Sequence, residues 1–156
     1  MLPPNHERAL HEMLDVLERL SIPYRLTGGV AGNLYGSSWP PHDIDIDVPR
    51  DALPRLTAAL GDSVIAPVSR CVDEEFDVIV LKAMLDGVLI ELVQVEESYH
   101  CVGGVWRASG GDLSCRQSLT WLGRAIWVQP LEEIIAYKRR LGRRADVSDL
   151  EQFLAR

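Results

Sequence analysis

The sequence has no paired cysteines, no long hydrophobic run and no excess of positive charge. Its three cysteines, Cys71, Cys101 and Cys115, form no CxxC pair, so neither a disulfide framework nor a zinc site is expected. No stretch approaches the length of a membrane-spanning helix. The N-terminus carries Pro, His and Glu where a signal peptide has an apolar run. These absences predict a cytoplasmic protein with reduced thiols and no membrane association.

Several other classes of protein are also disfavoured. The net charge of −7 argues against extended, sequence-blind binding to nucleic acid, which needs a basic surface. Internal repeats, low-complexity tracts and linkers are absent, as are a Walker-type loop and a Ser/His/Asp or Cys/His arrangement. The 156 residues are 47% hydrophobic, which is enough for one core. We therefore expect a single domain spanning residues 1–156.

The stretch around which the chain is organised runs from 26 to 48, LTGGVAGNLYGSSWPPHDIDIDV. Asp43, Asp45 and Asp47 alternate along a predicted strand, so their side chains share one face. Carboxylates held that close favour a cation, and Mg²⁺ binds through a few carboxylate oxygens and substrate phosphates. Upstream, Gly28 and Gly29 would let backbone N–H groups approach a phosphate at the start of a helix.

Hydrophobic periodicity, Gly and Pro give the order of the other elements. Asp86-Gly87 joins two apolar, β-branched runs and predicts a hairpin whose strands are covered on both faces. Asn5 is the expected N-cap of the first helix, and Pro130 the expected first residue of a later helix. The predicted elements are helix 5–20, strand 24–27, helix 30–35, strand 43–48, helix 51–60, strands 63–68, 77–85, 88–95 and 124–128, and helices 130–141 and 147–154.

This order predicts an α+β fold with a mixed sheet, helices packed on it, a β-rich insert and two C-terminal helices. The insert, residues 96–128, contains the glycine pairs 103–104 and 110–111, which mark turns. It also contains Trp106, Trp121 and Trp127, which either pack in the core or offer stacking surfaces to an acceptor.

Glu91 is the candidate for a third carboxylate. It is the only ionisable residue between Val88 and Val95, and an unpaired charge in such a strand is costly, so it needs a partner. The simpler interpretation is an edge-strand residue that faces water or pairs with Arg. For Asp47 we expect a role in loop or helix capping. His6, His11 and His100 are expected at the surface.

Thr27-Gly28-Gly29, the thirteen residues 30–42 and then Asp43-Ile44-Asp45 resemble the nucleotidyltransferase superfamily that shares the fold of DNA polymerase beta. The resemblance implies Mg²⁺-dependent transfer of NMP from an NTP to a hydroxyl of a small molecule, a protein or an RNA end. It further implies that Asp43 and Asp45 bind two metal ions, and that Glu91 binds the catalytic ion and takes the acceptor proton. Gly28 and Gly29 would bind the nucleotide.

The C-terminal tail resembles the branch that contains abortive-infection toxins and antibiotic-modifying transferases. By that resemblance Lys138 reaches the triphosphate, whereas Arg143 and Asp146 hold the tail together. The alternative is that these basic residues complement a helix dipole. Trp39 and Pro41 stand where many members carry Arg and Thr or Ser before Asp-x-Asp. This departure favours a rival hypothesis, a nucleotide-binding module or partner subunit without turnover.

Overall fold

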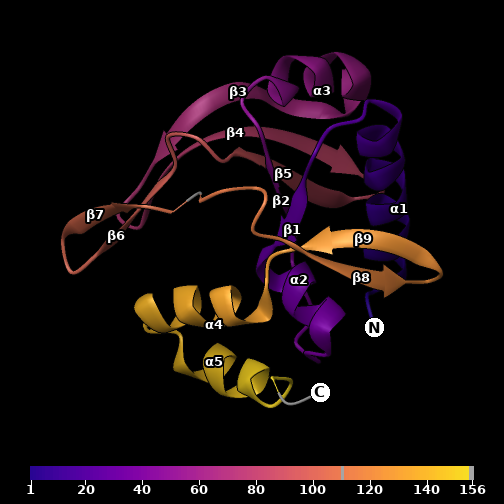
Figure 1. The fold of residues 1–156 in the computed structure, drawn as a ribbon. Coiled ribbons are helices and arrows are strands. Elements are labelled where there is room, and N and C mark those ends of the chain that lie inside the picture. Colours follow the sequence, from indigo (N-terminus) through magenta and orange to yellow (C-terminus); the bar gives the residue numbers. More distant parts are fainter. Residues whose placement is uncertain (110, 155–156) are drawn as a thin grey trace.

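Residues 1–109 and 111–154 are described by the computed structural model, which folds them into helices around a single mixed sheet (Figure 1). The helices are α1 (Pro4–Arg19), α2 (Gly28–Tyr35), α3 (Ala52–Leu60), the 3-10 helix η1 (Gly61–Ser63), α4 (Leu131–Arg140) and α5 (Arg144–Glu151). The strands are β1 (Arg25–Thr27), β2 (Ile44–Val48), β3 (Val64–Val72), β4 (Phe76–Leu85), β5 (Val88–Gln94), β6 (Tyr99–Val102), β7 (Val105–Ala108), β8 (Gln117–Trp121) and β9 (Arg124–Val128).

The sheet runs in the order β7-β6-β4-β5-β2-β1-β9-β8, with β3 paired to β4 beside this path. β2 lies parallel to β5 and antiparallel to β1, so the sheet is mixed as expected. α4 and α5 lie together on the opposite side of the molecule from α3 (Figure 1). The predicted α+β fold, its β-rich insert and its two C-terminal helices are confirmed.

The core explains why β2 alternates in polarity. Ile44, Ile46 and Val48 are fully buried and belong to the main hydrophobic cluster with the apolar face of α1. Because neighbouring side chains of a strand point to opposite faces, Asp45 and Asp47 lie on the other face of the sheet. Burial of the isoleucines thus fixes the direction of the carboxylates.

The predicted hairpin is confirmed, with Leu85 opposite Val88. Asp86 and Gly87 both have positive φ, as a two-residue turn of this kind requires. One expectation was wrong, because β5 is not covered equally on both faces. Its residues alternate between buried and half-buried, and two of the half-buried ones, Glu91 and Val93, line a cavity.

Several predicted boundaries differ from the observed ones. α1 begins at Pro4 with Pro3 as its N-cap, not with Asn5, because proline is tolerated in the first turn of a helix. Pro130 is likewise the N-cap of α4 and not its first residue. α5 begins three residues earlier than expected, directly after the turn at Gly142, whose φ is +73°. Gly110 of the predicted insert turn lies outside the described residues.

Two of the three histidines expected at the surface are buried. His6 is 8% exposed and its Nε2 donates a hydrogen bond to the His42 carbonyl, and His100 is 2% exposed beside Tyr137. The His6 ring is hydrogen-bonded to the loop that precedes β2, and the His100 ring is packed edge-on against Tyr137 of α4. Within the described part of the chain, no helix is long and apolar enough to cross a membrane.

Candidate active site

Three carboxylates converge on the open face of the sheet. Asp43 directly precedes β2, Asp45 lies within it, and Glu91 is the register partner of Asp45 on the parallel neighbour β5. One carboxylate oxygen from each lies within 4.8 Å of the other two. We call these three residues the acidic triad. Pairing of β2 with β5 therefore brings together the residues that the sequence singled out.

The triad is crowded with negative charge. Burial, then the charges of Asp43 and Glu91, raise the pKa of Asp45 to about 8. Burial and Glu91 also raise the pKa of Asp43. Hard oxygen ligands at this spacing are what Mg²⁺ takes, and a divalent cation would offset both the cost of burying these charges and the repulsion between them. The donor set thus fits a divalent metal ion.

The backbone of Gly28 passes so close to Asp45 of the triad that position 28 requires glycine. Its φ is +64°, and a Cβ at this position would lie 2.3 Å from Oδ2 of Asp45. Only glycine meets both conditions without strain. Gly29 differs, because a Cβ there would be 3.6 Å from Pro41, an ordinary contact. Both glycines line the cavity at the N-terminus of α2.

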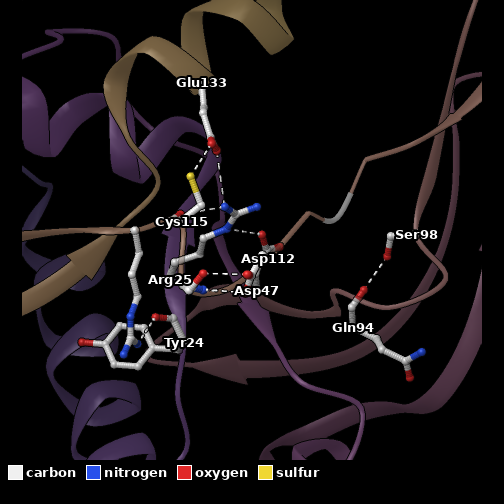
Figure 2. A network of polar contacts seen from close by, with 10 residues as sticks. Tyr24, Arg25, Asp47, Gln94, Ser98, Asp112, Cys115 and Glu133 are labelled. Atoms are coloured by element: carbon white, nitrogen blue, oxygen red, sulfur yellow. Dashed lines mark hydrogen bonds and ion pairs between the residues drawn. The ribbon is translucent and has the colours of Figure 1, made fainter.

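Asp47 has a partner of its own, so it is not a capping residue as predicted. Nε of Arg25 donates a 2.9 Å hydrogen bond to Oδ2 of Asp47, and the Arg25 side chain is 3% exposed (Figure 2). The same guanidinium reaches Glu133 on α4 and the carbonyl of Cys115. Burial raises the pKa of Asp47, whereas Arg25 acts in the opposite direction. Arg25 thereby ties β1, β2, α4 and the insert together below the triad.

A cavity of about 680 Å³ opens over the triad. Its lining also includes three apolar side chains of β4 and β5, those of Val78, Val80 and Val93. α2, α4 and α5 supply further lining, as do Trp39 and Pro41. Among the described lining residues the three insert tryptophans do not occur; Trp121 instead stacks on His11, and Arg116 lies over Trp127. The insert tryptophans therefore offer this cavity no stacking surface.

The basic residues at the cavity are held by carboxylates. Nζ of Lys138 donates a 2.9 Å hydrogen bond to Asp146, and the Arg143 guanidinium lies 3.4 Å from the Glu75 carboxylate. The contact between Lys138 and Asp146 is in accord with the prediction that Asp146 holds the tail. Lys82 was missed by the sequence reasoning. Its Nζ lies 3.5 Å from Oε1 of Glu91. The two-residue turn at Asp86-Gly87 was a usable signal, since it fixes Lys82 opposite Glu91.

Comparison with solved structures shows which fold this is. A protein from Thermotoga maritima described as a nucleotidyltransferase superposes with a TM-score of 0.79 at 22% identity, over 99% of this chain and 96% of that one. The lincosamide adenylyltransferase LnuA with lincomycin bound superposes with a TM-score of 0.64 at 15% identity, over 94% of this chain and 97% of that one. ANT(2")-Ia with adenylyl-2"-tobramycin superposes with a TM-score of 0.57 at 15% identity, over 90% of this chain and 84% of that one. The fold is thus that of the nucleotidyltransferases.

The sequence itself gives the family. Residues 9–142 match the family model of the aminoglycoside-2''-adenylyltransferases. The chain belongs to this family, and it is accordingly a nucleotidyltransferase and an enzyme. No curated protein matches the sequence.

Proposed function

We propose that this enzyme transfers an adenylyl group from ATP to a hydroxyl of a small molecule. The observation that carries the proposal is the acidic triad, whose oxygens meet within 4.8 Å beside Gly28 at the floor of the cavity. Membership of an adenylyltransferase family supports ATP as the donor.

Asp43 and Asp45 would hold two Mg²⁺ ions, and Glu91 would complete the site of one of them. A bound divalent cation neutralises the charge that develops on the transferred phosphoryl group. The raised pKa of Asp45 supports this assignment, because a carboxyl group that is costly to ionise alone becomes a ligand once a cation is present. Gly28 leaves the space in which the Asp45 carboxylate stands.

The chain's own groups would position the reactants. The acceptor oxygen bonds to the α-phosphorus, the bond from that phosphorus to its bridging oxygen breaks, and pyrophosphate leaves. Glu91 takes the proton of the acceptor hydroxyl. The backbone of Gly28 and Gly29 at the start of α2 and the ammonium of Lys138 would face the triphosphate. Lys138 must then leave Asp146, its partner in this structure.

The charge of the cavity favours a cationic acceptor. Its described lining carries seven acidic and four basic side chains. The acidic set is Asp43, Asp45, Asp47, Asp73, Glu91, Asp146 and Asp149, and the basic set is Arg25, Lys82, Lys138 and Arg143. A concave site with an excess of negative charge concentrates cationic ligands. An aminoglycoside, which carries several amines and hydroxyls, is therefore the first acceptor to test, and a lincosamide the second.

The test is adenylylation itself. Purified protein is incubated with each NTP, Mg²⁺ and a panel of aminoglycosides and lincosamides, and pyrophosphate release and product mass are measured. We expect ATP to give an acceptor heavier by one adenylyl group. Asp45→Asn removes the product, whereas Asp62→Asn, an exposed carboxylate outside the cavity lining, leaves it unchanged.

Two results would contradict the proposal. Product formation that persists in Asp45→Asn would remove the triad from the chemistry. Binding of ATP without release of pyrophosphate for any acceptor of the panel would remove small-molecule transfer and favour a nucleotide-binding module.

A further inference from the structure

The use of lysine in this chain is unusual. Two of its sixteen basic residues are lysines, Lys82 and Lys138, and both line the cavity. Arginine is suited to fixed, bidentate ion pairs, whereas lysine is a compact charge on a flexible stem that can change partners. The fourteen arginines include those that fasten elements together, such as Arg25 and Arg124. Both mobile cations are thus placed where a substrate would bind.

Lys82 lies in one register row with two members of the triad, Asp45 and Glu91. Thr27 on β1 is the register partner of Asp45 on β2, Asp45 that of Glu91 on β5, and Glu91 that of Lys82 on β4. Residues directly opposite each other on paired strands share a face. The row therefore ends with one positive charge beside the negative charges of Asp45 and Glu91, on the floor of the cavity.

The hold on Lys82 is loose. Its ammonium is 3.5 Å from Glu91, against 2.9 Å for the contact of Lys138 with Asp146. The Lys82 side chain is 36% exposed, and that of Lys138 is 14% exposed. Glu91 is also the carboxylate that a divalent cation would take. When that happens, the pair with Lys82 loses most of its attraction, because a divalent charge now stands beside Glu91.

We propose that Lys82 binds the phosphate chain of the nucleotide, which rests on the function proposed above. In the metal-free protein its ammonium neutralises Glu91. Once the triad holds a divalent cation, the ammonium leaves Glu91 and contacts phosphate oxygens on the β4 side of the triad. Lys82 would then supply a positive charge for the phosphates, which Trp39 cannot do at the position where many nucleotidyltransferases carry a basic residue.

A cross-strand ion pair that merely stabilises the sheet is the competing interpretation. Such a pair would stay intact when the nucleotide binds. Removing it would change the stability of the fold and leave nucleotide affinity unchanged. Arg70 offers a matched control. On β3 it makes an ion pair with Asp77 on the paired strand β4, and it lies outside the cavity lining.

Lysine labelling followed by mass spectrometry tests the proposal directly, because two lysines give two separate peptides. The labelling rate is measured without metal, with Mg²⁺, and with Mg²⁺ plus α,β-methylene-ATP, whose α–β bridge is not cleaved. We expect Mg²⁺ alone to leave Lys82 as reactive or make it more so, and the nucleotide to slow its labelling severalfold. Calorimetry on the same samples reports whether the nucleotide binds.

Protection of Lys138 together with unchanged labelling of Lys82 would overturn the proposal and leave the function intact. Absence of nucleotide binding would overturn both. Strong protection of Lys82 by Mg²⁺ alone would also overturn the proposal, because the ammonium would then remain at Glu91.

Variants give the second measurement. Lys82→Met is expected to weaken nucleotide binding about tenfold, the worth of one charge-assisted hydrogen bond. The same variant should bind Mn²⁺ up to about fivefold more tightly, because a competing ion pair is gone. Lys82→Arg should restore much of the nucleotide affinity, and Arg70→Met should change neither constant. Equal affinities in Lys82→Met and the wild type would reduce Lys82 to a structural residue.

Discussion

Two neighbouring glycines should respond in opposite directions to the same substitution. In Gly28→Ala the new Cβ would lie 2.3 Å from the Asp45 carboxylate, at a φ of +64°. The left-handed backbone costs about 1–2 kcal/mol of unfolding free energy. The contact must also push the Asp45 side chain aside, because a carbon and an oxygen that are not bonded cannot approach to that distance. Loss of one ligand should weaken Mn²⁺ binding at least about tenfold, which corresponds to ~1.4 kcal/mol.

Gly29→Ala is the matched control. Its Cβ would meet Pro41 at 3.6 Å, and Gly29 already has an ordinary helical backbone in α2. Alanine should therefore increase the free energy of unfolding by about 0.5 kcal/mol, because it loses less backbone entropy than glycine. The Asp45 carboxylate does not touch this position, so Mn²⁺ affinity should stay at the wild-type value.

Urea unfolding and Mn²⁺ calorimetry on the three proteins measure both effects. Equal stability and equal Mn²⁺ affinity in Gly28→Ala and the wild type would refute the close approach of Gly28 to Asp45. Loss of Mn²⁺ binding in both variants would show that the glycine pair acts through the fold as a whole.

Two further predictions concern buried charge. Arg25→Met leaves Asp47 buried without its cation and should lower the free energy of unfolding, measured in urea, by about 3 kcal/mol. A loss of free energy smaller than that of an exposed ion pair would contradict the role of Arg25 in holding these elements together. Burial lowers the pKa of His100, whose ring nitrogens lack a hydrogen-bond partner among the described residues. Since the unfolded chain then binds the proton more readily, stability should fall as the pH drops below about 6.5. Urea unfolding of His100→Phe at pH 7.5 and 5.5 should show a smaller fall than the wild type, and an equal fall would assign the acid sensitivity elsewhere.

Local patterns predicted the parts of the fold and site that depend on alternation or on short turns. Asp43 and Asp45 follow from the period of β2, and the lone charge in the apolar run of β5 marks Glu91. Asp86-Gly87 predicts a hairpin of β4 and β5, and its register places Lys82 beside Glu91. The convergence of three carboxylates depends on these same features.

Contacts between segments far apart in the sequence could not be predicted from such local patterns. Arg25 meets Asp47 because β1 pairs with β2, and it meets Glu133 because α4 packs over the insert. Neither contact leaves a periodic or turn signal in the sequence. Burial of His100 depends likewise on α4, which brings Tyr137 against β6. The long-range half of the site therefore required the three-dimensional structure.

Divalent-metal calorimetry on the metal-free protein tests the central claim most directly. Asp45 and Asp47 lie two residues apart on the same face of β2, but Asp47 is held by Arg25 and Asp45 belongs to the triad. Asp45→Asn should abolish Mn²⁺ binding, and Asp47→Asn should retain it within about twofold, the change expected of a charge outside the ligand set. Equal binding in Asp45→Asn and the wild type would contradict the account.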